Sequence, residues 1–134
     1  MSEARHILTI LAVEDLARSV AFYRTAFGWP THVDVPVYVE LTLPDGNGLG
    51  LYVKEAFARN VHQVPTLATA EKIGGTELYF RVDDLDAAIG QLEAAGATCL
   101  SPRAPRDWGD EAAYYADPDG NVLVVAVKLE APSA

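Results

Sequence analysis

The chain has 134 residues, of which 50% are hydrophobic and 22% are charged, the usual size and composition of one globular domain. With 19 acidic and 10 basic residues, its net charge of -9 disfavours binding to nucleic acid. No apolar run is long enough to cross a membrane, and the first residues, MSEARH, do not resemble a signal peptide, so we expect a cytoplasmic protein without membrane partners. The lone Cys99 excludes an internal disulfide, and we expect it to be buried as a small apolar residue.

Two similar segments each predict the start of a helix. The pattern V-x-D-L occurs at residues 13–16 and again at 82–85. In both places an alternating apolar run, typical of a strand, ends and a helical period begins. Asp15 and Asp84 therefore stand where the N-caps of two helices are expected.

The end of each helix is followed by a second shared motif. Gly28 and Gly96 stand where the two helices should stop, because glycine readily adopts the left-handed conformation that ends a helix. The tetrapeptide PDGN then occurs at residues 44–47 and 118–121, and each copy lies between alternating apolar runs. Its Asp-Gly pair predicts a hairpin in each half.

These repeated motifs divide the chain into two modules. We expect a single domain over residues 1–134, with module one at about 5–54 and module two at about 76–128. The connection, residues 55–75, is long and has no clear period, and we expect it either to fold over the modules or to fray. Each module is too small to bury its own apolar face, so the modules are expected to pack together.

Strand alternation assigns the residues of each module to two sheet faces. One parity is almost entirely apolar and should lie beneath the helices. The other parity mixes tyrosines with charged groups, namely Tyr38, Glu40, Tyr52, Glu77, Tyr79, Arg81 and Tyr114. A solvated face would be mostly charged and a core would lack carboxylates. This second face therefore predicts an aromatic-lined cleft that binds a ligand.

Residues 101–111, SPRAPRDWGDE, precede the second predicted hairpin and contain Trp108 among charged residues. One interpretation is a lid whose indole stacks on a planar or cationic ligand. The other is a loop that a single buried tryptophan holds in place.

The chain resembles a known superfamily. The two V-x-D-L helix starts, the pattern F-Y-x-x-x-F-G at 22–28 and D-P-D-G-N at 117–121 are similar to those of the vicinal oxygen chelate superfamily. That superfamily includes glyoxalase I, extradiol dioxygenases, and fosfomycin and bleomycin resistance proteins. The resemblance implies an α+β fold in which two βαβββ modules form a cupped mixed sheet, usually in a homodimer, with the ligand inside the cup.

The resemblance also indicates where a metal would be held. Metal-dependent members place four ligands on the inner face, at positions that this chain fills with Leu8, Gly50, Glu77 and Val124. Tyr52 is the other candidate for the Gly50 position, because Gly48 can shift the register of the hairpin. Only Glu77 offers a donor atom, whereas a catalytic zinc normally takes three protein ligands. We therefore expect no metal and no cofactor. A displaced site formed by His6, Glu40 and Glu77 is the alternative.

Three functional hypotheses follow. The first is a metal-independent protein that binds a small aromatic or cationic molecule in an acidic, tyrosine-lined cleft. The second is a lyase or dioxygenase of the glyoxalase type that uses the displaced metal site, or an enzyme in which Glu77 alone acts as the catalytic acid or base. The third is a dimeric regulator whose cleft is empty.

Overall fold

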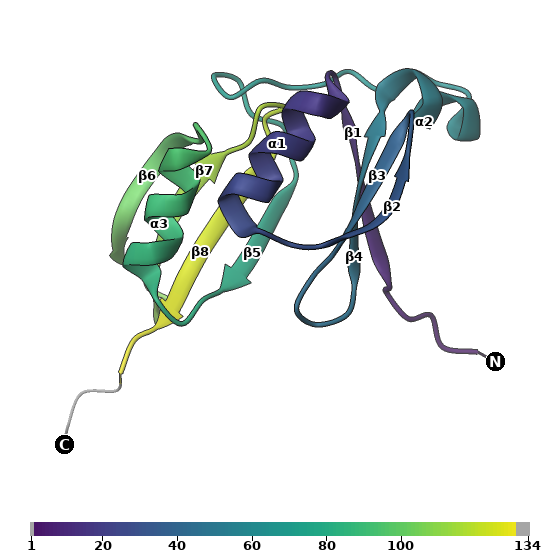
Figure 1. Cartoon of the computed structure of the whole chain (residues 1–134). Helices are drawn as coiled ribbons and strands as arrows, with labels where there is room; N and C mark the ends of the chain where they lie inside the picture. Colours follow the sequence, from purple (N-terminus) through teal and green to yellow (C-terminus); the bar gives the residue numbers. More distant parts are fainter. Residues whose placement is uncertain (1, 131–134) are drawn as a thin grey trace. The chain divides into compact units, whose positions relative to one another are not determined.

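In the computed structural model, which describes residues 2–130, the chain forms two compact units (Figure 1). The first unit comprises the chain up to Arg24 together with Gly28–Leu67, and the second comprises Thr25–Phe27 and the chain from Ala68 onward. The elements of the first half are β1 (Leu8–Val13), α1 (Leu16–Phe27), β2 (Thr31–Val35), β3 (Tyr38–Thr42), β4 (Gly48–Val53) and α2 (Lys54–Val61). Those of the second half are β5 (Glu77–Arg81), α3 (Leu85–Ala94), β6 (Thr98–Pro105), β7 (Asp110–Ala116) and β8 (Val122–Lys128).

Each unit contains one four-stranded mixed sheet with the same topology. The strand orders are β1-β4-β3-β2 and β5-β8-β7-β6. The first strand of each module pairs in parallel with the last, and the remaining neighbours are antiparallel. The repeat in the sequence therefore corresponds to two βαβββ modules, and the expected α+β class is confirmed. None of the described helices is long and apolar enough to cross a membrane.

The predicted helix caps are confirmed. The Asp15 carboxylate accepts a hydrogen bond from the backbone N–H of Arg18 at 3.1 Å, and Asp84 accepts one from Ala87 at 3.0 Å. These bonds satisfy backbone donors that the first turn of a helix leaves without partners. Gly28 caps the end of α1 with φ of 70°, a conformation that favours glycine.

The two PDGN turns have the same backbone bonds but different side-chain caps. In both, the first residue of a five-residue turn donates to the carbonyl of the fifth, from Leu43 to Asn47 and from Asp117 to Asn121. In the first turn the Asp45 carboxylate accepts bonds from the backbone and side chain of Asn47. In the second turn Asp117 binds Asn121 in this way, and it is almost completely buried.

The expected connection contains more structure than predicted. Residues 54–61 form α2, which starts directly after β4 and has no side-chain cap at Val53. No period in the sequence indicated this helix. Cys99 is also exposed on β6 instead of buried, because β6 is the edge strand of its sheet.

Alternation along the strands separates a core face from a mixed face, as predicted. The core residues of the first sheet share one parity, and they are Leu11, Val13, Val39, Leu41, Leu49 and Leu51. The mixed face of the second sheet is also buried in part, because Ala112, Val122, Val124 and Ala126 form a closed apolar cluster against which Tyr114 packs.

Candidate functional site

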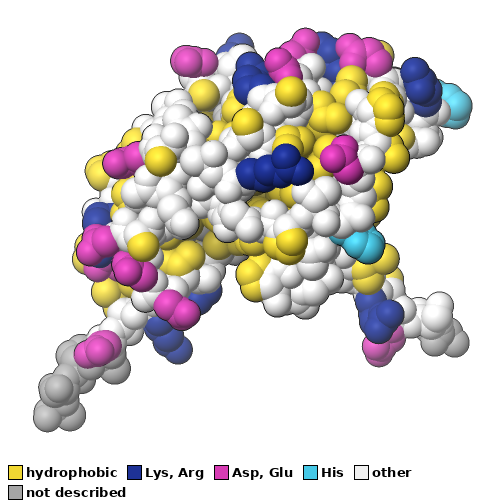
Figure 2. Space-filling model, viewed as in Figure 1, with side chains coloured by type: hydrophobic (Ala, Val, Ile, Leu, Met, Phe, Trp, Pro, Cys, Tyr) yellow, Lys and Arg dark blue, Asp and Glu magenta, His cyan; other side chains and the backbone are white. Residues whose placement is uncertain are grey.

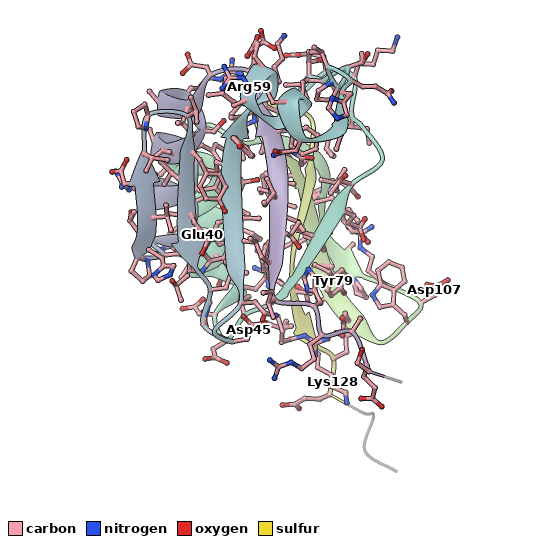
Figure 3. The ribbon with its side chains drawn as sticks, turned by 90° about the vertical axis from the view of Figure 1, so that its right-hand side faces the viewer. Glu40, Asp45, Arg59, Tyr79, Asp107 and Lys128 are labelled. Atoms are coloured by element: carbon pink, nitrogen blue, oxygen red, sulfur yellow. The ribbon has the colours of Figure 1, made fainter. Side chains whose placement is uncertain are left out.

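The mixed face of the first sheet carries a hydrogen-bonded pair of side chains, Tyr38 and Glu40. The Tyr38 hydroxyl donates to Oε1 of Glu40 at 2.6 Å, and both side chains are half-buried. Glu40 is labelled in Figure 3. They lie two residues apart on β3, so strand alternation puts them on the same face. No other described residue donates to the Glu40 carboxylate, which leaves Oε2 free to accept from a ligand.

A glycine on the neighbouring strand makes room for this pair. Gly50 lies opposite Glu40 and diagonally opposite Tyr38. A Cβ atom at Gly50 would lie only 2.4 Å from the Tyr38 hydroxyl oxygen and 2.6 Å from its ring. The tyrosine ring therefore covers Gly50, and no other residue fits there without moving it.

Further aromatic rings extend this cluster toward α2. The Tyr38 and Tyr52 rings meet edge to face with their centroids 5.1 Å apart. Tyr52 in turn meets Phe57 of α2 at 6.3 Å, again edge to face. Edge-to-face pairs are favourable arrangements of aromatic rings, so these three side chains support one another. We call Tyr38, Glu40, Tyr52 and Phe57 the tyrosine cluster.

The surroundings of Tyr38 keep its hydroxyl protonated. Burial, followed by the hydrogen bond to the Glu40 carboxylate, raises the pKa of Tyr38 well above its ordinary value. Tyr38 is therefore neutral near neutral pH. It remains a donor to Glu40, which holds the carboxylate in place on the sheet face.

In the second unit, four side chains form a chain of hydrogen bonds that ends on Asp110. The Trp108 indole N–H donates to the Tyr79 hydroxyl at 2.9 Å, and that hydroxyl donates to Oδ2 of Asp110 at 2.5 Å. The Arg81 guanidinium donates to the same Oδ2 at 2.9 Å. We call Trp108, Tyr79, Arg81 and Asp110 the tryptophan cluster.

Exposure differs sharply within the tryptophan cluster. Asp110 is only 6% exposed, whereas Trp108 is 54% exposed. The interpretation that a buried tryptophan holds this segment is therefore wrong. Trp108 lies in the turn between β6 and β7 and is held by its indole N–H. Burial, followed by the hydrogen bond to Asp110, raises the pKa of Tyr79, so its hydroxyl also stays protonated.

Arg106 and Tyr114 form a second contact on this sheet. The Arg106 guanidinium lies over the Tyr114 ring, 4.9 Å from its centroid. It also donates to the Ala112 and Pro102 carbonyls, each at 2.9 Å. These hydrogen bonds give the two carbonyls a donor in the region where bulges interrupt the pairing of β6 with β7. Burial, followed by the Glu77 carboxylate, raises the pKa of Tyr114.

Glu77, the predicted catalytic residue, is exposed at the start of β5. It pairs in register with Val122, and its carboxylate is close enough to Tyr114 to act on that hydroxyl electrostatically. An exposed carboxylate is not enclosed in the apolar pocket that the acid-base hypothesis assumed.

The residues at the expected ligand positions do not fit a catalytic metal. Tyr38 covers Gly50, Val124 is completely buried in the apolar cluster, and Leu8 has no donor atom. His6 donates to or accepts from the Thr9 hydroxyl at 2.9 Å. Within residues 2–130, no three His, Cys, Asp or Glu side chains come together as a metal site. No catalytic step is therefore assigned to a metal.

A groove in the first unit lies apart from the predicted site. It has a volume of about 640 Å³ and is lined mainly by α1 and by residues 34–36. Hydrophobic atoms are exposed around α1 and beside β2 and β3 on the face drawn in Figure 2, with acidic and basic side chains scattered among them. None of the predicted site residues lines this groove.

The structure adds three residues that were not among the predicted site residues, namely Phe57 of α2, Asp110 and Arg106. The sequence identified Asp110 and Arg106 only as charged neighbours of Trp108. Asp110 is the first residue of β7 and shares the parity of Ala112 and Tyr114, which is a signal that could have placed it on the mixed face. Arg106 lies in a turn, where parity gives no information.

Comparison with known proteins establishes the family. The chain belongs to the glyoxalase-like domain family, whose sequence model matches residues 9–126. This match confirms the resemblance to the vicinal oxygen chelate superfamily. No curated protein matches the chain.

Solved structures share this fold at low sequence identity. A glyoxalase-related enzyme from Fulvimarina pelagi is 24% identical, with 92% of this chain and 88% of that chain covered and a TM-score of 0.82. A glyoxalase/bleomycin resistance protein/dioxygenase from Nocardioides is 25% identical, with 99% and 89% covered and a TM-score of 0.78. Lactoylglutathione lyase from Agrobacterium tumefaciens is 23% identical, with 94% and 95% covered and a TM-score of 0.70.

Proposed function

We propose that this chain binds a small aromatic or cationic molecule without a metal, and that the tyrosine cluster is its main contact for a cation. The observation that carries this proposal is the Tyr38 ring over Gly50. A position that the family resemblance assigns to a metal ligand is here filled by a tyrosine that holds a carboxylate.

The chemistry of the tyrosine cluster favours a cation. Aromatic rings attract cations through their negative faces, and the free Oε2 of Glu40 adds a full negative charge beside them. A hydrogen bond between a ligand ammonium and a carboxylate is roughly twice as strong as a neutral one. The net charge of -9 also raises the local concentration of cations around the protein.

An enzymatic function is the second candidate. The fold is shared with a protein named lactoylglutathione lyase, and the negative charge of Glu77 acts on the hydroxyl of Tyr114. In this alternative the chain is a lyase or dioxygenase of the glyoxalase type with a displaced metal, or Glu77 transfers a proton without one. Stoichiometric metal in protein purified without chelators would favour the first form of this alternative.

A ligand screen with matched variants tests the binding proposal. Aromatic amines and quaternary ammonium compounds are screened by thermal shift, and each hit is titrated by calorimetry. Glu40→Gln keeps the size of the side chain and removes its charge, which should cost about 1.5–3 kcal/mol of binding free energy. That cost corresponds to roughly ten- to a hundredfold weaker binding.

The control is Glu55→Gln, which removes the same charge from an exposed position on α2. It should leave affinity within about twofold, because screened surface charges contribute little. Equal affinity for the wild type and both variants would show that the Glu40 carboxylate does not contact the ligand. Glu77→Gln, measured in parallel, tests whether the second carboxylate contributes.

A further inference from the structure

We infer that the tryptophan cluster of the second unit is a separate subsite for a planar, negatively charged group, of which an aromatic carboxylate is the simplest example. This inference goes beyond the proposed function, because it assigns a ligand group of opposite charge to different residues. It is carried by contacts that lie entirely within the second unit.

The Trp108 indole is held in place but is not covered. Its turn is closed by backbone bonds between Arg106 and Asp110 at 2.7 Å and between Gly109 and Arg106 at 3.3 Å. Gly109, the residue after Trp108, has φ of 93°, a conformation that favours glycine and that turns the backbone into β7. The bond from the indole N–H to Tyr79 then fixes the ring by its edge. More than half of Trp108 remains exposed, so a planar group can stack on it with little loss of side-chain freedom.

The charge available to a ligand at this cluster is positive. Asp110 is almost fully buried and already accepts from Tyr79 and Arg81. The Arg81 side chain is 52% exposed, and Asp110 is its one carboxylate partner among the described residues. A guanidinium has five N–H donors in a planar fork, so most of these donors can still bind a carboxylate.

Other charges near the cluster agree with this assignment. Lys128 lies directly opposite Asp110 on the neighbouring strand and is exposed, so a second cation flanks the buried carboxylate. Asp107 is the exposed acidic neighbour of Trp108, and Figure 3 shows it at the outer side, away from Tyr79. Glu77 is exposed two residues before Tyr79 on the same face, so the ligand group we propose pairs with Arg81 on the other side of Tyr79.

The two clusters thus select different groups. The tyrosine cluster presents a free carboxylate oxygen, whereas the tryptophan cluster presents guanidinium donors beside an indole. Bidentate pairing with Arg81 would fix the carboxylate in the plane of the guanidinium. The attached ring would then lie flat against Trp108.

The indole N–H signal of Trp108 in a nuclear magnetic resonance spectrum tests this inference. The chain has two tryptophans, and Trp29→Phe leaves Trp108 as the only source of an indole signal. The protein is titrated with benzoate, and with benzamide and benzylamine as neutral and cationic probes of the same shape. We expect benzoate to move the Trp108 signal in a saturable way and to bind about tenfold or more tightly than either other probe.

Arg81→Gln should weaken benzoate binding about tenfold or more while the protein remains folded. The matched control is Arg103→Gln, which removes the same charge from an arginine of the same unit that is paired with Asp86 and Glu111. That control should change benzoate binding by less than about twofold. If Arg81→Gln does not fold, the comparison of the three probes on the Trp29→Phe protein decides alone.

Equal binding of benzoate and benzamide, or a Trp108 signal that benzoate does not move, would overturn the inference. Glu40→Gln should leave the benzoate titration unchanged. Failure of the cation screen together with a positive benzoate result would overturn the proposed function and keep this subsite. The reverse pattern would keep the proposed function and remove the subsite.

Discussion

Tyr38 donates a 2.6 Å hydrogen bond to Glu40, two residues further along the same strand. The bond runs along one face of β3, and the tyrosine ring must lie across the neighbouring strand to make it. It can do so because the neighbour is Gly50, where any side chain would collide with the ring. One glycine thus permits both the orientation of the tyrosine and the fixed position of the carboxylate.

Gly50→Ala should therefore destabilise the first unit. The new methyl group would lie 2.4 Å from the Tyr38 hydroxyl oxygen, so the ring must move and its bond to Glu40 must weaken. Overpacking of this kind costs about 1–3 kcal/mol, which a urea unfolding curve measures. The control is Gly90→Ala in α3, where a Cβ meets nothing within 4 Å. That substitution should raise stability by about 0.5–1 kcal/mol, and a similar gain for Gly50→Ala would contradict the contact.

Asp110→Asn should destabilise the second unit. The buried carboxylate accepts from Tyr79 and from Arg81, and an amide accepts both bonds more weakly. We expect a loss of about 1–3 kcal/mol in the free energy of unfolding, together with a change in the fluorescence of Trp108. Asp107→Asn, an identical change at an exposed neighbour, should stay within about 0.5 kcal/mol. An unchanged free energy of unfolding in Asp110→Asn would show that the chain of hydrogen bonds does not stabilise the fold.

The buried tyrosines predict a loss of stability at alkaline pH. Burial is the main cause that raises the pKa of Tyr115 to about 12, and it also raises that of Tyr38. The unfolded chain ionises first, near the ordinary tyrosine value of about 10, so above that pH the folded state holds more protons. The stability that these tyrosines contribute should be constant below about pH 10 and should fall between about pH 10 and 12.

Urea midpoints measured across this range check the sign of the effect. Tyr115→Phe removes one ionising group and should make the decline shallower, although it leaves the second tyrosine in place. A decline that is equally steep in Tyr115→Phe and in the wild type would contradict the assignment to Tyr115.

We also propose that the chain forms a homodimer. Both described sheets are open, so each has two edge strands with backbone groups that could pair with another chain. Closed twofold dimers are the commonest way to cover such surfaces. Light scattering at micromolar concentration should give twice the mass of one chain. A monomer mass would remove the dimer without changing the fold.

The sequence predicted those parts of the fold that depend on short-range signals. Asp15 and Asp84 bond backbone groups three residues away, and each PDGN turn closes on itself, so the local pattern is sufficient. It did not predict α2, which starts without a capping side chain immediately after a strand. It also gave no separate signal for β6, where two shifts of register and two prolines interrupt the alternation.

The candidate site was predicted less completely, because its contacts depend on register between strands. Parity correctly put Tyr38 and Glu40 together on one face of the first sheet. It also put Tyr79 and Arg81 together on one face of the second sheet. The contact of Tyr38 with Gly50 depends on a diagonal across two strands, which alternation alone does not specify. The exposure of Trp108 and the role of Asp110 depend on the conformation of a turn.

The most direct test of the account is calorimetric titration of a cationic hit from the ligand screen, with and without a chelator of divalent metals. The residues at the family's ligand positions offer one carboxylate, and Tyr38 fills the place of another ligand. We therefore predict the same affinity in both titrations, and roughly ten- to a hundredfold weaker binding by Glu40→Gln in both. Loss of binding in the chelator, restored by a single divalent ion, would contradict metal-independent binding.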